Sequence, residues 1–95
     1  MSEATGRVEG SNSEHTCRFF GLSTCIWCKK TRQFLEDNDV AFDFTYVDLL
    51  QGEERARAIE EVKKWNPGVN FPTVVIDDEP VVGFEPDTIK EKLGL

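Results

Sequence analysis

Apolar residues along the chain follow two different spacings. Between residues 41 and 48, the aromatic residues Phe42, Phe44 and Tyr46 alternate with Asp43, Thr45 and Val47, and such a period of two in aromatic and β-branched residues is typical of a strand. Further on, Ala56, Ile59, Val62 and Trp65 recur every three residues between charged ones, which is typical of one face of a helix. Shorter apolar runs bounded by glycine or proline indicate further strands. The spacing therefore predicts a chain of both strands and helices.

The predicted elements follow the order strand, helix, strand, helix, strand, strand, helix. They cover residues 16–21, 26–38, 41–48, 51–65, 73–76, 80–83 and 88–93. The first two strands are joined by a helix, so they should be parallel and connected by a right-handed crossover. The next two strands should form a hairpin. Asp87 can cap the last helix, with Pro86 in front of the cap. This order predicts an α/β domain.

The first 14 residues differ in composition from the rest of the chain. They are rich in serine, glutamate, glycine and asparagine, and Val8 is the only larger aliphatic residue there besides Met1. Such a segment buries too little apolar surface to order itself. We therefore expect a flexible tail over residues 1–14 and a single domain over residues 15–95, since a chain of 95 residues suffices for one domain but not for two.

Cys25 and Cys28, three positions apart, lie where the pattern of the first strand gives way to that of the first helix. If Cys25 lies at the start of the helix, N–H groups without intrahelical partners point toward its sulfur, and the helix dipole adds positive potential. Both favour the thiolate, which is the nucleophilic form of cysteine. Cys28, one turn into the helix, would be close enough to form a disulfide with Cys25. Such a pair can exchange disulfides, because one cysteine attacks and the other resolves the mixed disulfide.

Three cations follow the cysteine pair. Lys29, Lys30 and Arg32 make the first turns of the helix basic within an acidic protein. One interpretation is an ordinary solvated helix face. The other is that these cations favour the Cys25 thiolate and attract a substrate that carries carboxylates.

Other interpretations use the same cysteines. His15 and Cys17, together with Cys25 and Cys28, provide a sufficient set of zinc ligands. Two bulky residues between the close cysteines and the place of His15 beside the tail argue against such a site. A purely structural disulfide would close too small a loop to stabilise much. An iron–sulfur cluster shared between two chains is the remaining alternative. Cys17, within a strand, is expected to be a buried apolar side chain.

The charge of the chain limits its partners. The formal net charge of −7 argues against a nucleic-acid or anionic-membrane surface, both of which need clustered lysine and arginine. No apolar run approaches the roughly 20 residues that span a bilayer, and the N-terminus lacks the apolar core of a signal peptide. We therefore expect a cytoplasmic protein. In that compartment, three cysteines fit a catalytic pair plus one spare thiol better than a disulfide scaffold.

Four motifs, in this order along the chain, resemble those of a glutaredoxin. They are the Cys-x-x-Cys pair, Tyr46-Val47-Asp48, Phe71-Pro72-Thr73-Val74 and Gly83-Phe84-Glu85-Pro86-Asp87. The resemblance covers about residues 16 to 95. It implies the thioredoxin fold, a four-stranded mixed sheet flanked by three helices. It also implies a thiol–disulfide oxidoreductase with no bound cofactor.

The resemblance assigns roles to residues of this chain. It makes Cys25 the attacking thiol and Cys28 the resolving thiol. It places the substrate on Thr24, Trp27, Phe71, Pro72, Gly83 and Asp87. Among these, Trp27 would line the substrate groove, and Pro72 would follow a cis peptide bond and face the cysteines.

The resemblance also implies how substrates are held. The backbone of Phe71 would pair with the peptide that carries the target cysteine. Asp87 and the N–H groups of its helix start would hold the γ-glutamyl end of glutathione. The implied partners are disulfide-containing proteins, with glutathione or a thioredoxin-reductase-type enzyme as the electron source, and the protein itself would be a monomer.

The chain departs from the family pattern at three places. Ile26-Trp27 replaces the common Pro-Tyr pair, Leu22 replaces a common glutathione-binding lysine, and Phe84 replaces the second of two glycines. The segment from Gly83 to Asp87 is more similar to glutaredoxin-like redoxins, which donate electrons to ribonucleotide reductase and are reduced by a thioredoxin reductase. These departures concern the reductant rather than the dithiol itself.

Overall fold

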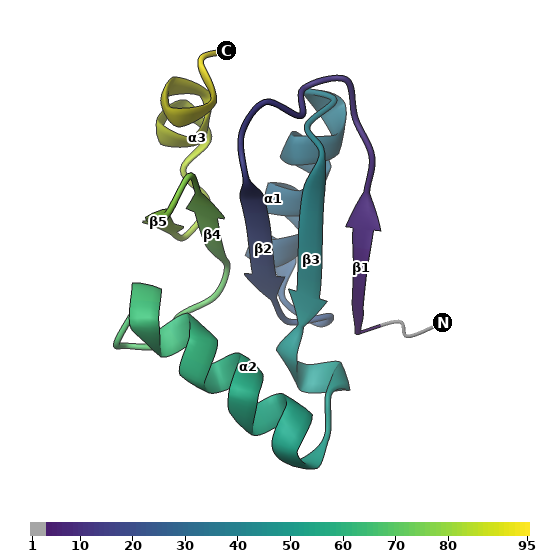
Figure 1. Ribbon diagram of the computed structural model, residues 1–95, viewed down its shortest axis with the longest axis vertical. Coiled ribbons are helices and arrows are strands. Elements are labelled where there is room, and N and C mark those ends of the chain that lie inside the picture. The colour runs from purple at the N-terminus through teal and green to yellow at the C-terminus, as the bar shows by residue number, and fades with distance from the viewer. Residues whose placement is uncertain (1–3) are drawn as a thin grey trace.

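A mixed five-stranded sheet forms the centre of the computed structural model, which describes residues 4–95 (Figure 1). Its strands are β1 (Thr5–Val8), β2 (Cys17–Gly21), β3 (Phe42–Tyr46), β4 (Thr73–Ile76) and β5 (Glu79–Val82). They lie in the order β1-β3-β2-β4-β5. The β2–β3 pair is parallel, as the helix between these strands predicts, and the other pairs are antiparallel. The predicted α/β architecture and the β4–β5 hairpin are confirmed.

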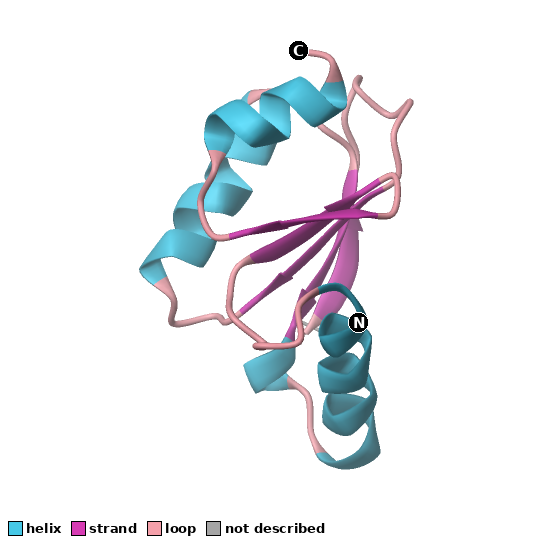
Figure 2. Ribbon diagram, turned by 90° about the vertical axis from the view of Figure 1, so that its left-hand side faces the viewer, coloured by secondary structure: helices cyan, strands magenta, loops and turns pink. Residues whose placement is uncertain are grey.

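Helices cover both faces of this sheet (Figure 2). They are α1 (Ile26–Asp37), α2 (Gly52–Trp65) and α3 (Pro86–Leu93), with a short 3-10 turn, η1 (Val47–Leu49), before α2. The larger core joins α1 and α3 to one face through buried side chains such as Phe19, Leu35 and Ile89. A smaller core joins α2 to the opposite face. No helix within residues 4–95 combines the length and the apolar character needed to span a bilayer.

The segment expected to be a flexible tail contributes the edge strand β1. Its residues pair antiparallel with β3, from Thr5 opposite Thr45 to Val8 opposite Phe42. The expectation is therefore wrong for residues 5–8, while residues 1–3 lie outside the described part of the chain. The strand needs few buried side chains, because backbone hydrogen bonds to the neighbouring strand hold it. Gly6 also allows the Phe44 ring to lie directly against the backbone, where a Cβ atom would come within 2.8 Å of the ring.

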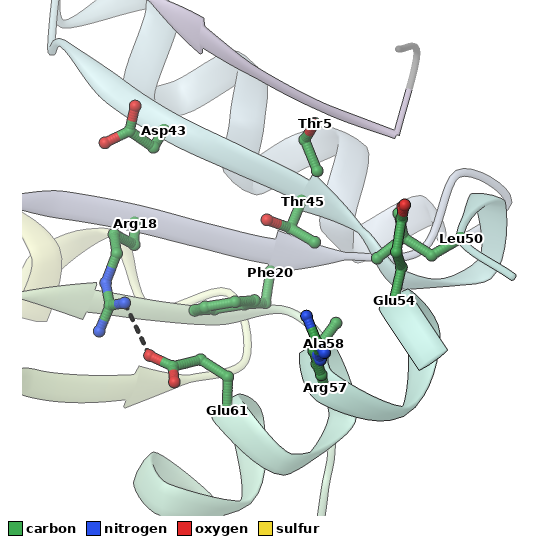
Figure 3. A pocket seen from close by; sticks show the side chains of 10 residues that line it. All are labelled: Thr5, Arg18, Phe20, Asp43, Thr45, Leu50, Glu54, Arg57, Ala58 and Glu61. Atoms are coloured by element: carbon green, nitrogen blue, oxygen red, sulfur yellow. Dashed lines mark hydrogen bonds and ion pairs between the residues drawn. The ribbon is translucent and has the colours of Figure 1, made fainter. Parts of the chain in front are cut away.

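The second helix covers less of the sheet than its sequence pattern predicts. Val62 is fully buried, Ile59 and Trp65 are half-buried, and Ala56 is exposed, so the predicted face is wrong at Ala56. Beside the helix, an open hollow of about 380 Å³ remains above β2 and β3 (Figure 3). Its floor includes the Phe20 ring.

One histidine connects the chain before β2 to the β4–β5 turn. The Nδ1 atom of His15 lies 2.5 Å from a carboxylate oxygen of Asp77, and the second carboxylate oxygen accepts the Thr16 N–H at 2.9 Å. The hydrogen bond with Asp77 raises the pKa of His15, and the same contact lowers the pKa of Asp77. His15 therefore forms part of the fold and is held away from the cysteine pair.

We expect the His15–Asp77 contact to make stability depend on pH near neutrality. Because the pKa of His15 is raised on folding, its contribution is complete below the ordinary value of 6.5 and is lost as pH rises through the folded value. The chain has a single histidine, so one imidazole resonance in an NMR titration reports this pKa. Asp77→Asn should bring the resonance back toward a midpoint of 6.5. A midpoint at or below 6.5 in the unmodified protein would contradict the assignment.

Candidate active site

The two close cysteines lie at the start of α1, at the end where β2 runs into the helix (Figure 1). Cys25 is the N-cap residue, and its Sγ accepts a hydrogen bond from the Cys28 N–H at 3.2 Å. Its own N–H donates to the Leu22 carbonyl at 3.2 Å. Cys25 is half-buried. The predicted position of Cys25 at a helix N-terminus is confirmed, with a backbone donor directed at its sulfur.

Cys28 has a different environment. Its side chain is 1% exposed and packs in the larger core. Burial, together with a hydrogen bond to Cys25, raises the pKa of Cys28 to about 12, although the Leu22 N–H, 3.5 Å from its sulfur, works in the opposite direction. At neutral pH Cys28 is therefore a thiol. The pair combines one accessible sulfur at the helix start with one protected sulfur a turn behind it.

We expect alkylation to distinguish Cys25 from the other cysteines of the reduced protein. Cys17 is 3% exposed, and burial raises its pKa to about 12 as well. Because the thiolate is the reactive form, iodoacetamide at neutral pH should modify Cys25 first and leave Cys17 and Cys28 largely unmodified. Peptide mass spectrometry over a time course measures this order. The unfolded protein is the control, in which all three should react alike, and equal rates in the folded protein would contradict the assignment.

A groove beside the cysteine pair is formed by residues far apart in the sequence. Its volume is about 300 Å³, and it is lined by Trp27, Phe71, Pro72, Gly83 and Phe84. The Phe71–Pro72 peptide bond is cis, as the resemblance implies. The Gly83 N–H donates to the Pro72 carbonyl at 2.8 Å, which ties the end of β5 to this loop. Gly83 has a φ of 86°, a conformation that favours glycine.

Phe84 is the lining residue that sequence reasoning did not assign to the site. Its ring stacks on Trp27, with centroids 6.0 Å apart, and meets the edge of Phe34 at 6.4 Å. Trp27 remains 53% exposed despite this contact. In the sequence, Phe84 was marked only by its replacement of the second of two glycines that are common in the family. Its ring makes one wall of the groove aromatic.

Asp48 fixes the loop in front of the cysteines. One carboxylate oxygen accepts the Ser23 N–H at 2.9 Å, and the other accepts the Ser23 hydroxyl at 2.5 Å. Burial would raise the pKa of Asp48, but these hydrogen bonds outweigh it and lower the pKa. The carboxylate therefore stays charged and holds Ser23, which lies next to Leu22 and its N–H group. The Tyr46-Val47-Asp48 motif pointed to this residue without indicating its contact.

Two of the expected substrate-binding residues lie outside the groove lining. Thr24 is exposed in the turn before Cys25, and Asp87 is exposed in the first turn of α3. The prediction that Asp87 caps that helix is wrong, because the N-cap is Glu85 and Pro86 is the first helical residue. Proline suits this position, since its fixed φ matches a helix and its missing N–H would have no intrahelical partner.

The alternative metal site is not assembled. His15 contacts Asp77 and Cys17 lies in the larger core. Within residues 4–95, no three histidine, cysteine, aspartate or glutamate side chains are grouped as metal ligands would be. The hollow beside α2 is likewise separate from the cysteines, and its half-buried charged residues Arg18 and Glu61 pair with each other at 2.7 Å (Figure 3).

Comparisons with known proteins point to one family. A family model described as Glutaredoxin matches residues 17–81. An uncharacterized glutaredoxin-like 8.6 kDa protein in the rubredoxin operon of Clostridium pasteurianum is 32% identical over 79 residues, which are 79% of this chain and 97% of that protein.

Solved structures extend the comparison to the fold. The crystal structure of a glutaredoxin from Methanosarcina mazei Go1 has a TM-score of 0.90 and 45% identity, and covers 98% of this chain and 90% of its own. Methanosarcina acetivorans methanoredoxin has a TM-score of 0.84 and 44% identity, with 87% and 88% covered. The thioredoxin fold is thereby confirmed, with five strands in the sheet where four were expected.

Proposed function

Because this chain belongs to the glutaredoxin family, we propose that it is a thiol–disulfide oxidoreductase that uses the Cys25–Cys28 dithiol to reduce disulfides. The observation that carries the proposal is the unequal environment of the two sulfurs. Cys25 caps a helix and is half-buried, whereas Cys28 is buried and protonated one turn behind it. A dithiol reductant needs this difference, because one sulfur must attack while the other waits.

The reaction proceeds in two exchanges. The Cys25 thiolate attacks one sulfur of the substrate disulfide, the substrate S–S bond breaks, and the leaving thiolate takes up a proton. Cys28 then loses its proton and attacks the Cys25 sulfur, which releases the second substrate thiol and leaves a Cys25–Cys28 disulfide. Two electrons have passed to the substrate. In the mixed disulfide the Cys25 sulfur is neutral, so the repulsion between its negative charge and a Cys28 thiolate, one cause of the raised pKa of Cys28, is removed.

The oxidised pair must be returned to the dithiol by an external reductant. Two features favour a thioredoxin-reductase-type enzyme over glutathione. Leu22 provides no cation for the glycine carboxylate of glutathione, and Phe84 closes on Trp27 where the family commonly has a glycine. The groove lined by Trp27 and Phe84 is open and aromatic, so it can accept an apolar side chain from the surface of a partner protein. We also propose that the protein is cytoplasmic, because thiols are kept reduced in that compartment and this dithiol must be reduced to act.

The test is turnover of a small mixed disulfide with each electron source. One assay supplies glutathione, glutathione reductase and NADPH, and the other supplies thioredoxin reductase and NADPH. We expect faster NADPH consumption in the second assay. Faster turnover with glutathione would overturn the choice of reductant and leave the dithiol chemistry in place. No turnover in either assay would overturn the proposed function itself.

A further inference from the structure

Two lysines next to the cysteine pair are unpaired in a protein rich in carboxylates. Within residues 4–95, seven of the eleven lysines and arginines form ion pairs, and Lys29 and Lys30 are among the four that do not. By contrast, the neighbouring lysines Lys63 and Lys64 on α2 each pair with a glutamate at 3.4 Å. The exposed cations at the start of α1 are thus available to an external anion.

The helix places these lysines beside the reacting sulfur and the groove. The Lys29 N–H donates to the Cys25 carbonyl at 3.1 Å, and Lys30 follows Trp27 by three residues, a spacing at which helical side chains are neighbours. The Lys30 Nζ lies 4.7 Å from the centroid of the Trp27 ring. An anion that meets Lys30 therefore also lies next to the groove wall.

Nearby acidic groups leave this positive charge largely uncompensated. Asp37 lies with Lys30 around a second hollow on the other side of Phe84. The Asp37 carboxylate accepts a hydrogen bond from Gln33 at 2.8 Å. A second acidic residue of α1, Glu36, forms an ion pair with Arg32. Neither carboxylate is paired with Lys30.

An apolar surface lies between the lysines and the cis-proline loop. Ile26 is 64% exposed and Trp27 is 53% exposed, which is unusual for such large apolar side chains. The groove of about 300 Å³ continues this surface to Phe84, Gly83 and Pro72. An apolar side chain placed here would remove both ring surfaces from water, which favours binding.

We propose that the preferred substrates are protein segments in which the target cysteine is flanked by one apolar and one acidic side chain. The apolar side chain enters the groove at Trp27 and Phe84, and the acidic side chain meets Lys29 and Lys30 while Cys25 attacks the cysteine. This inference rests on the proposed function and adds the substrate class. It assigns a specificity role to cations that the exchange reaction itself does not require.

The test uses capped hexapeptides joined through their single cysteine to a small chromogenic thiol. One peptide carries leucine before the cysteine and glutamate two residues after it. Three comparison peptides replace the glutamate with glutamine, the leucine with serine, or both. Since exposed ion pairs are individually weak, we expect kcat/KM for the leucine–glutamate peptide to exceed that of its glutamine partner about threefold to tenfold at low salt. The difference should shrink as ionic strength rises.

Matched variants separate a local effect from one of net charge. Lys29→Gln combined with Lys30→Gln should bring the glutamate-to-glutamine ratio close to one. Lys63→Gln combined with Lys64→Gln removes the same charge from α2 and should leave the ratio as it is. Phe84→Ala should reduce the preference for leucine over serine. A ratio near one in the unmodified protein, or equal effects of both lysine pairs, would overturn the inference.

A binding measurement keeps recognition separate from chemistry. In a Cys25→Ser variant, titration with the same peptides in thiol form should quench tryptophan fluorescence more strongly for the leucine–glutamate peptide. This preference should persist even if the unmodified protein reduces none of the peptides, in which case only the proposed function fails. Turnover of all peptides at equal rates, with equal binding, would leave the dithiol function intact and overturn the substrate class.

Discussion

Replacing Cys25 with serine is expected to abolish disulfide exchange, with a fall in rate of more than about 10³-fold. Loss of a catalytic nucleophile has effects of at least this size. Cys25 is the half-buried sulfur at the helix N-cap, and the buried Cys28 thiol, with its pKa raised to about 12, cannot replace it. Turnover of a protein disulfide at equal protein concentration measures the effect. The serine hydroxyl can keep the cap, so the fold should be retained.

The partner substitution gives a different and equally specific result. Cys28→Ser leaves the attack by Cys25 intact and removes the resolving thiol, so the mixed disulfide should accumulate. Non-reducing mass spectrometry should show one substrate attached at Cys25. Cys17→Ser is the matched control, since it removes a buried thiol from the same core and should keep turnover. Full dithiol turnover by the Cys28→Ser variant, or retained exchange by Cys25→Ser, would show that the roles are assigned incorrectly.

The cysteine pair could be located from the sequence because its signals are local. A strand that ends at Gly21, a turn, and a helix without glycine or proline place Cys25 at a helix start by spacing alone. The same holds for the hairpin and for the parallel pairing of β2 and β3. The cis bond before Pro72 and the grouping of Trp27 with the proline loop followed from the family resemblance.

The features that were missed depend on contacts between distant segments or on backbone bonds alone. β1 buries little side-chain surface, so a composition argument misses a strand held by hydrogen bonds to the edge of β3. The stacking of Phe84 on Trp27 joins residues 57 positions apart, and the bonds from Ser23 to Asp48 join residues 25 positions apart. The sequence prediction places the cap of α3 two residues too late, because Pro86 occupies the first helical position and does not precede the helix.

The packing beneath the active site connects stability to thiol protection. Phe19 is fully buried, and its ring meets Phe42 at 6.3 Å and Tyr46 at 6.0 Å between centroids. A Cβ atom at Gly21 would lie 2.7 Å from the tip of the Phe19 ring and 3.3 Å from the Cys28 Cβ. Gly21 therefore lies in the packing between the Phe19 ring and the resolving cysteine, Cys28. The ring fills space that would otherwise open toward Cys28.

Phe19→Ala is accordingly expected to lower the free energy of unfolding by about 3–5 kcal/mol, the usual cost of emptying a buried phenylalanine site. Domains of this size have about 5–15 kcal/mol in total, so the variant should be close to its stability limit. Urea denaturation of the reduced protein measures the loss. Phe19→Leu keeps part of the volume and should cost less, and Val82→Ala, at a side chain 41% exposed, should change stability by less than about 0.5 kcal/mol.

Phe19→Ala should also make Cys28 more reactive than it is in the unmodified protein, an effect that the loss of stability alone does not predict. A cavity beside Cys28 admits water, so the burial that raises the pKa of Cys28 is reduced and its alkylation should become faster. Cys25, whose sulfur lies at the helix start, should react at an unchanged rate in the folded protein. Measuring both rates in Phe19→Leu, which remains well folded, separates this effect from global unfolding. Equal acceleration of both cysteines would indicate unfolding, and an unchanged Cys28 rate would show that Phe19 does not protect it.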